Sequence, residues 1–255
     1  MTHYSKRSLL VALFFLTGHF GLLNRASAKL LIVPELAQNS DVIFSRTPRT
    51  DNLGSSSWWR TKVKAQATAN QGKKYNGCLF GDSISSGIGN TLGEHTFNFG
   101  MGGLSSVSLV EQLKFLKSAH VKCSKAIIAV GTNDAWYKIS NDLFIKKMKQ
   151  AILLVRAMRA SQVTLIPAFY STVAASHNQT IAGSIQRVEK INALMRQVAA
   201  IEQVPIKTKG LQVLFSHKGL REDLTFDGVH LNNNGKKVYR QVLLKILSTK
   251  PLIAP

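Results

Sequence analysis

The stretch Cys78-Leu79-Phe80-Gly81-Asp82-Ser83-Ile84-Ser85-Ser86-Gly87 decides the fold class, because it joins a short apolar run to a polar turn. Residues 78–80 have the composition of a buried strand, and the residues after Ser83 are suited to the start of a helix. The stretch therefore predicts a strand that passes through a tight turn into a helix, with a serine at the turn.

The same alternation continues on both sides of this stretch. Further strand-like runs are Thr96 to Phe99, Ala126 to Val130, Val163 to Phe169 and a last one near Leu211 to Phe215; helical spacing appears in Ser106 to Ala119, Leu143 to Ala160, Ile181 to Ile201 and Gly235 to Leu247. Apolar faces on two of these helices comprise Leu109, Leu113 and Leu116, and Ile145, Met148, Ile152 and Val155. Strands that alternate with helices predict an α/β fold with a parallel sheet covered on both faces.

Polar loops follow the expected strands, and in such a sheet function gathers at the carboxyl ends of the strands. The four loops contain Gly81-Asp82-Ser83, then Gly100, Gly102 and Gly103, then Gly131-Thr132-Asn133-Asp134, and finally Asp227-Gly228-Val229-His230. We expect all four loops to open on one edge.

These loops supply the groups that nucleophilic acyl transfer needs. Ser83 is a weak nucleophile until a base such as His230 takes its proton, and Asp227, three residues earlier, can fix the tautomer of that base. The backbone N–H groups of Ser83 and Gly103 and the side-chain amide of Asn133 can complete a three-donor oxyanion hole.

Competing motifs fail. The Gly-x-Ser-x-Gly elbow is broken at Ser85, and the glycine-rich stretch that starts at Gly100 lacks the last glycine of a dinucleotide fingerprint. Neither a Walker-type phosphate loop nor metal-ligand spacing among the histidines is found, so we expect no cofactor and no metal.

The four ordered blocks resemble those of the SGNH (GDSL-type) hydrolases, from about Tyr75 to Leu247; the only departure is Asp-Ser-Ile in place of Asp-Ser-Leu. The resemblance implies a flavodoxin-like three-layer α/β/α fold with a mainly parallel five-stranded sheet, and metal-free hydrolysis of acyl esters. It implies that Ser83 is nucleophile and oxyanion donor, that Gly103 and Asn133 are the other donors, and that Asp227 and His230 complete the triad.

Neighbouring residues have more ordinary expected roles. Asp82 is expected to start a helix or brace its loop, and Asp134 to brace its own loop. Trp136 and Tyr137 are expected either to wall the substrate pocket or to pack beneath the next helix. The segment Tyr170 to Thr180 is expected to be a solvated loop, with substrate contact as the alternative.

The N-terminus divides into two parts before the hydrolase domain of residues 75–255. Lys6 and Arg7, an apolar run and the small-x-small pattern Ala26-Ser27-Ala28 predict a signal peptide over residues 1–28, with an uncleaved anchor as the alternative. Residues 29–74 predict an extension that Trp58-Trp59 pins to an apolar surface.

The chain is strongly basic, with 33 Lys and Arg against 13 Asp and Glu and a formal charge of +20. Removing residues 1–28 takes away three basic residues and no acid, which leaves +17. We therefore expect a secreted or periplasmic esterase, with O-acetyl groups on an anionic envelope glycan as the first substrate class and no nucleic-acid partner. Alternatives are a lysophospholipid or lipid esterase, a sugar O-acyltransferase, and an inactive basic protein that binds envelope polyanions or a membrane surface.

The two cysteines are expected to be free of one another. Cys78 lies five residues before Ser83, whereas Cys123 lies ten before Asn133. If both site residues end neighbouring parallel strands, the cysteines are offset by about five residues, or roughly 16 Å. A disulfide requires about 4.4–6.8 Å between Cα atoms.

Overall fold

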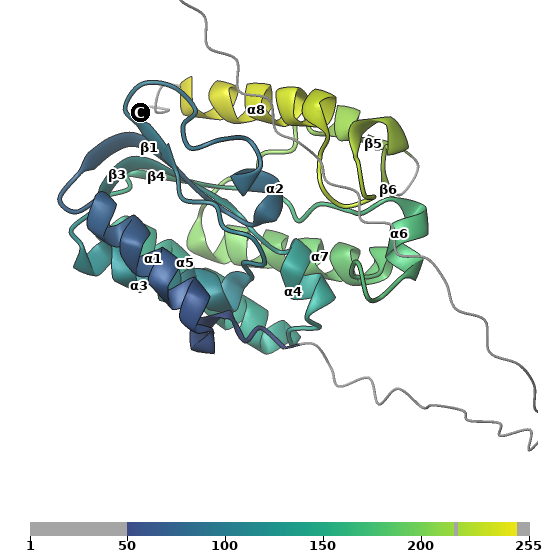
Figure 1. Ribbon diagram of the computed structural model, residues 1–255, viewed down its shortest axis with the longest axis horizontal. Coiled ribbons are helices and arrows are strands. Elements are labelled where there is room, and N and C mark those ends of the chain that lie inside the picture. Colours follow the sequence, from purple (N-terminus) through teal and green to yellow (C-terminus); the bar gives the residue numbers. More distant parts are fainter. Residues whose placement is uncertain (1–49, 217–218, 249–255) are drawn as a thin grey trace, which may run out of the picture. The chain divides into compact units, whose positions relative to one another are not determined.

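A four-stranded parallel sheet forms the middle layer of the computed structural model, which describes residues 50–216 and 219–248 (Figure 1). The strands are β1 (Lys74–Gly81), β2 (Thr96–Asn98), β3 (Lys122–Ala129) and β4 (Gln162–Leu165), in the spatial order β2-β1-β3-β4. This order is that of the flavodoxin-like fold. The expected α/β/α class is confirmed.

The fifth strand differs from the expectation. Ile206 forms a single parallel bridge with Leu165 at the outer edge of β4, where a fifth strand of this fold would lie. Pro205, which has no N–H to donate, precedes it, so the ladder stays short. Residues 211–215, expected as the last strand, instead contain the 3₁₀ helix η2 (Gln212–Leu214).

Helices cover both faces of the sheet. One face is covered by α1 (Ser57–Ala69), α3 (Ser106–Ser118), α5 (Asn141–Ala157) and α7 (Ile185–Glu202), and the other by α8 (Asn233–Ser248) with the short α2 (Ser83–Ser86) (Figure 1). The remaining elements are the 3₁₀ helices η1 (Leu53–Ser55) and η3 (Glu222–Leu224), the short helices α4 (Thr132–Trp136) and α6 (Val173–His177), and the hairpin strands β5 (Phe215–Ser216) and β6 (Gly219–Leu220). Within the described ranges, none of the helices is long and apolar enough to cross a membrane.

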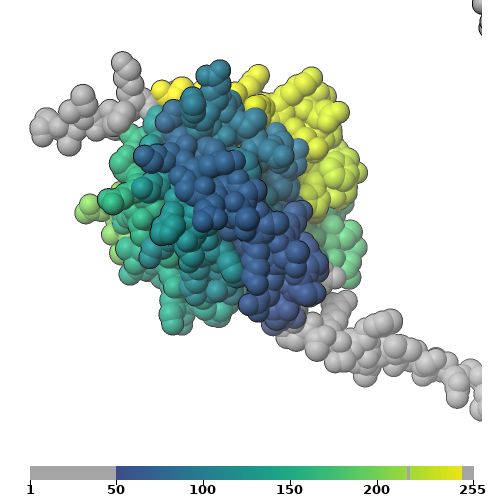
Figure 2. Space-filling view, turned by 60° about the vertical axis from the view of Figure 1, so that its left-hand side comes forward, coloured from purple at the N-terminus to yellow at the C-terminus, as the bar shows by residue number. Residues whose placement is uncertain are grey.

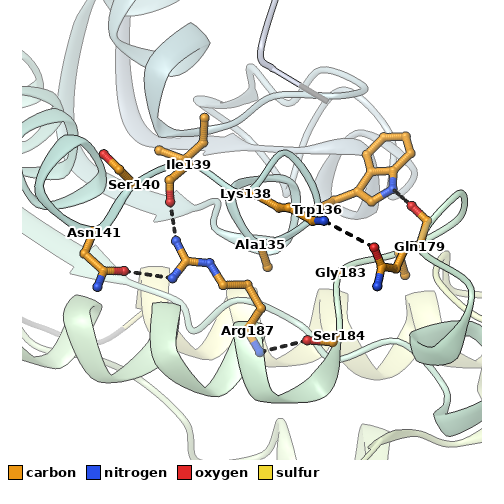
Figure 3. A pocket seen from close by; sticks show the side chains of 11 residues that line it. Ala135, Trp136, Lys138, Ile139, Ser140, Asn141, Gln179, Gly183, Ser184 and Arg187 are labelled. Carbon is orange, nitrogen blue, oxygen red and sulfur yellow. Dashed lines mark hydrogen bonds between the residues drawn. The ribbon is translucent and has the colours of Figure 1, made fainter. Parts of the chain in front are cut away.

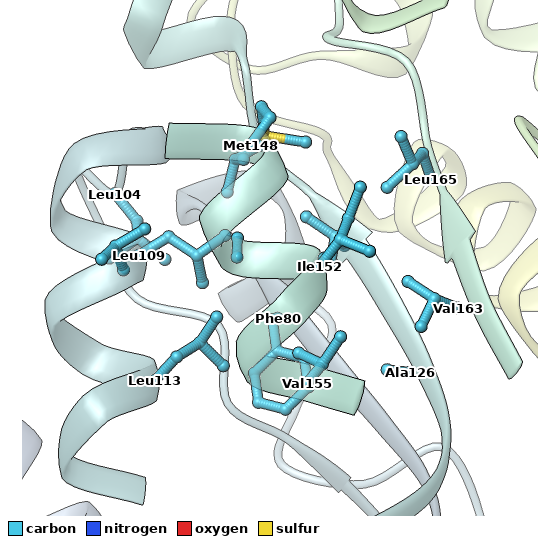
Figure 4. Packing of buried hydrophobic residues seen from close by; sticks show 14 of the residues in the cluster. Phe80, Leu104, Leu109, Leu113, Ala126, Met148, Ile152, Val155, Val163 and Leu165 are labelled. Carbon is cyan, nitrogen blue, oxygen red and sulfur yellow. The ribbon is translucent and has the colours of Figure 1, made fainter. Parts of the chain in front are cut away.

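The larger core lies between the sheet and the four-helix face. Figure 4 shows Leu109 and Leu113 of α3 packed beside Met148, Ile152 and Val155 of α5, all of them fully buried. Burying each such side chain contributes roughly 1.5–3 kcal/mol. The apolar faces expected for these helices are therefore the faces that hold the layers together.

Residues 50–69 pack against α3. Trp59 of α1 is fully buried in the core, whereas Trp58 is exposed, so only one of the two tryptophans anchors this segment. The carboxylate of Asp51 accepts hydrogen bonds from the hydroxyl of Ser105 and the backbone N–H of Ser108 at the start of α3. Figure 2 shows η1 and α1, in purple and blue, on the surface of the molecule. Residues 1–49, which contain the predicted signal peptide, lie outside the described residues.

The cysteine prediction is wrong: Cys78 and Cys123 form a disulfide, with 5.9 Å between their Cα atoms. Its premise fails because Ser83 and Asn133 do not end their strands at the same level. Gly81 pairs with Ala129, so Asn133 lies two residues further beyond its strand than Ser83 does, and the cysteine offset falls from five residues to three. Three residues of extended strand still span roughly 10 Å, so the register accounts for only part of the approach. Both side chains lie in the same buried cluster.

Candidate active site

Ser83 occupies the first helical position directly after β1. The side chain of Asp82 caps α2 by accepting a hydrogen bond from the N–H of Ile84 at 3.0 Å, which confirms the expected helix-start role. The turn is tight: a Cβ at Gly81 would lie 2.2 Å from the hydroxyl oxygen of Ser85. Only glycine at position 81 therefore lets the chain leave the strand and present Ser83 at the sheet edge.

Asp82 is itself buried beneath this turn. Burial raises the pKa of its carboxyl to about 7, although the N–H of Ile84 and the nearby His230 favour the charged form. The carboxyl group thus supports the serine from inside the protein rather than from the solvent side.

His230 reaches Ser83 from the loop that precedes α8. Its Nε2 lies 2.8 Å from the Ser83 hydroxyl oxygen, and its Nδ1 lies 2.6 Å from Oδ2 of Asp227. Burial opposes ionisation of Asp227, but hydrogen bonds from the backbone N–H groups of His230 and Val229 and from the imidazole outweigh it and lower its pKa. An ionised Asp227 favours the proton on Nδ1, so Nε2 is left to accept the serine proton.

A threonine braces this loop. The hydroxyl of Thr225 donates to the carbonyl of His230 at 2.6 Å and accepts from the N–H of Gly228 at 2.9 Å. Sequence reasoning missed Thr225, although a hydroxyl two residues before an Asp-x-x-His motif is a recognisable turn signal.

The segment after β4 supports the same loop from below. The N–H of Thr172 donates to the carbonyl of Gly228 at 2.8 Å, and a Cβ on Gly228 would lie 2.8 Å from Cβ of Ala175. Ser171, Thr172 and Ser176 are all buried. The expectation of a solvated loop is therefore wrong for Ser171, Thr172, Ala175 and Ser176, which are buried, whereas residues 173–174 and 177–180 are exposed.

The two other expected oxyanion donors, Gly103 and Asn133, come from two loops that one hydrogen bond joins. The side-chain amide of Asn133, the second residue of α4, donates to the carbonyl of Leu104 at 3.0 Å, next to Gly103. In the same loop the N–H of Gly100 is used by Asn98, at 2.9 Å. Among the described residues, the N–H of Gly103 has no such acceptor, so this donor can serve a ligand.

Asp134 locks the two donor loops together. Its buried carboxylate accepts hydrogen bonds from the backbone N–H and the hydroxyl of Ser106, at the start of α3. Burial raises the pKa of Asp134 to about 6, and these hydrogen bonds oppose the rise. Asp134 was expected to brace its own loop; instead it holds the neighbouring glycine loop against α4.

Tyr137 is partly buried against the larger core, and Trp136 stacks on it with ring centroids 5.3 Å apart. The role of Trp136 as a wall of the substrate pocket stays a prediction. The Tyr137 hydroxyl donates to the carbonyl of Gly103 at 3.1 Å, so this ring braces the donor loop. Trp136 lines a cavity beside α4. No group of three His, Cys, Asp or Glu side chains suited to a metal ion occurs in residues 50–216 and 219–248.

A hydroxyl, an imidazole and a carboxylate joined in series at the carboxyl edge of a parallel sheet define the class of serine-dependent hydrolases. The chain belongs to the GDSL-like Lipase/Acylhydrolase family, whose sequence pattern matches residues 79–238. It is thus a hydrolase of ester bonds, as the resemblance implied. No curated protein matches it by sequence.

Solved structures agree with the fold. A Bacteroides fragilis protein assigned as an acylhydrolase has a TM-score of 0.61 at 20% identity, covering 75% of this chain and 97% of its own. A GDSL-like lipase from Bacteroides thetaiotaomicron has a TM-score of 0.58 at 17% identity, covering 74% of this chain and 95% of its own. An acetyl-xylooligosaccharide esterase from Geobacillus, solved as a mutant, has a TM-score of 0.52 at 14% identity, covering 74% of this chain and 100% of its own. At these identities the likeness shows the shared fold alone.

Proposed function

We propose that this protein is an exported serine esterase that removes O-acyl groups, with O-acetyl groups on envelope glycans as the first substrate class. The observation that carries the proposal is the continuous hydrogen-bonded series from Ser83 through His230 to Asp227.

The geometry supports a two-step mechanism. Ser83 Oγ attacks the ester carbonyl carbon while its proton passes to Nε2 of His230, and the N–H groups of Ser83 and Gly103 and the amide of Asn133 stabilise the oxyanion. His230 then gives the proton to the departing alcohol. Water, deprotonated by His230, attacks the acyl-enzyme and releases the carboxylic acid.

Exposure at the site supports a polymeric substrate. The side chains of His230 and Asp227 are 37% and 38% exposed, and Phe226, stacked on the imidazole, is 68% exposed. An open site of this kind suits a short acyl group on a large glycan better than a long acyl chain that needs burial. A structural neighbour is by name an acetyl-xylooligosaccharide esterase, which supports the same choice.

Two features support export. The charge and apolar pattern of residues 1–28 is that of a secretory signal. The Cys78–Cys123 disulfide suits an oxidising compartment. We expect protein recovered from the envelope or medium to have the intact mass of a chain that begins at Lys29. A species that retains residues 9–23 would indicate a membrane anchor.

The activity test uses the mature protein, residues 29–255. We expect a burst of p-nitrophenol from p-nitrophenyl acetate that Ser83→Ala abolishes, whereas Ser86→Ala, one turn along the same helix, retains most of it. A series of acyl chain lengths beside acetylated glycans then identifies the substrate. A preference for long chains or lysophospholipids would replace the glycan proposal with a lipid esterase, and acyl transfer to sugar instead of water would indicate an acyltransferase.

A further inference from the structure

A cavity of about 450 Å³ lies beside α4, between the starts of α5 and α7 (Figure 3). Its lining includes the indole of Trp136, the amides of Asn141 and Gln179, and the cations Lys138 and Arg187. None of these residues takes part in the hydrogen bonds that join Ser83, His230 and Asp227. The cavity is therefore a second polar site whose contents the catalytic chemistry does not explain.

The positive charge of this cavity is not compensated. Arg187 donates to two neutral acceptors, Oδ1 of Asn141 at 2.8 Å and the carbonyl of Ile139. Lys138 donates to Oε1 of Gln179 at 3.2 Å. Within residues 50–216 and 219–248, no carboxylate forms an ion pair with either cation. A cavity with two cations and no acid is suited to an anion.

The arrangement is held in place before any ligand enters. The two bonds of Arg187 leave three of the five guanidinium N–H donors for other partners. The indole N–H of Trp136 donates to the carbonyl of Gln179 at 3.2 Å, which fixes the ring at the cavity edge (Figure 3). The guanidinium of Arg187 and the indole of Trp136, both held by hydrogen bonds, offer a sugar ring polar partners and an apolar surface.

The cavity is connected to the oxyanion donors through α4. Trp136 lies three residues after Asn133, or about 4.5 Å along a helix axis. Its neighbour Tyr137 stacks against it, with ring centroids 5.3 Å apart, and donates to the carbonyl of Gly103. The cavity residue Trp136 and the expected oxyanion donor Asn133 therefore belong to the same short helix, α4.

We propose that this cavity binds a carboxylate-bearing sugar unit of the glycan whose O-acyl group lies at Ser83. Arg187 and Lys138 face the carboxylate, and Trp136 packs against the sugar ring. This inference rests on the proposed function, since it names the sugar on which the esterase acts.

The test measures binding without turnover, in a Ser83→Ala background. Tetragalacturonate is titrated while tryptophan fluorescence is followed, with neutral xylotetraose as the paired probe. Trp59 is fully buried and cannot contact the ligand, and the exposed Trp58 is replaced by Phe in this background, so that Trp136 reports binding. We expect saturable quenching by the uronate, at least about tenfold tighter than by the neutral sugar, and weaker at higher salt.

The deciding variant is Lys138→Asn, matched by Lys64→Gln. Lys138 has a φ of +53°, a backbone conformation that Asn tolerates well, so the charge is removed without added strain. Lys64 is an exposed lysine on α1, and its replacement changes the net charge equally. We expect Lys138→Asn to weaken uronate binding about tenfold and Lys64→Gln to change it less than twofold.

Equal weakening by both variants, or equal affinity for the two sugars, would overturn the inference. The proposed function is judged separately, by hydrolysis of p-nitrophenyl acetate by protein with Ser83 intact. If that hydrolysis is absent while uronate still binds, the esterase proposal fails and the binding site stands. If the ester is hydrolysed while uronate does not bind, the esterase proposal stands and the binding-site proposal fails.

Discussion

Replacing Asn133 by Ala separates an oxyanion donor from a purely structural amide. The side chain is 92% shielded from solvent and gives one hydrogen bond, to the carbonyl of Leu104 at 3.0 Å, which leaves its second N–H for a ligand. Loss of an oxyanion donor lowers kcat by about 10²–10³-fold, or roughly 2.7–4 kcal/mol. Loss of the Leu104 bond alone lowers the free energy of unfolding by about 0.5–1.5 kcal/mol.

The assay is steady-state hydrolysis of p-nitrophenyl acetate, with thermal melts of each variant. We expect Asn133→Ala to lower kcat at least about a hundredfold and to leave KM nearly unchanged, with only a small fall in Tm. Tyr137→Phe is the matched control, because it removes a hydrogen bond to the same loop, at Gly103, without removing a donor to the oxyanion. Its kcat should fall by less than about tenfold.

A loss of less than about tenfold in kcat for Asn133→Ala, together with a fall in Tm, would refute the donor assignment. Asn133→Asp cannot replace this comparison. Because the amide nitrogen faces the Leu104 carbonyl, an aspartate would bring two oxygens together and impair the loop in either case.

Three further predictions concern stability and charge. The disulfide joins residues 45 apart in the sequence, and the chain-entropy relation gives a stabilisation of about 4 kcal/mol for such a loop. The double variant Cys78→Ala, Cys123→Ala should therefore lower Tm by about 8–16 °C. An unchanged Tm would show that the bridge is absent in solution. Burial raises the pKa of Asp82 to about 7, above its unfolded value near 3.9, so its contribution to stability is full below about pH 4 and is lost as pH rises to about 7. Between pH 5 and pH 8 the free energy of unfolding should therefore fall in the native protein by about 2–3 kcal/mol more than in Asp82→Asn. The same pH dependence in both proteins would show that Asp82 does not hold a proton in the folded state. A mature chain of charge +17 should bind anionic vesicles or polymers with an affinity that falls steeply with salt; binding indifferent to salt would exclude polyanions.

Much of the sheet could be predicted from the sequence because the carboxyl ends of β1 and β3 are apolar runs close to a glycine. The bounds of the strand that precedes Ser83 were expected at Cys78 to Phe80, and it extends to Lys74–Gly81. Helix α1 was missed because its buried residues, Trp59, Val63 and Ala67, form a stripe only one residue wide among polar neighbours. A spacing of four residues over two turns was the signal that could have identified it.

Register and loop packing could not be predicted. The disulfide depends on how far β1 and β3 slide past one another, and local sequence does not encode that shift. For the site, the motif residues were expected together, and the structure joins Ser83, His230 and Asp227 directly. It also shows what no motif contains: Asp134 of α4 accepts hydrogen bonds from Ser106 at the start of α3, which joins the first turns of the two helices.

The long separation between the serine and its base makes enzyme activity depend on the last part of the chain that the structure describes. All four strands of the sheet are complete by Leu165, yet His230 comes 147 residues after Ser83. A chain shortened just before Asp227 would retain every strand and both donor loops and still lack a base. Enzyme activity therefore reports that residues 227–248 are in place, which the presence of the sheet and of the two donor loops alone does not.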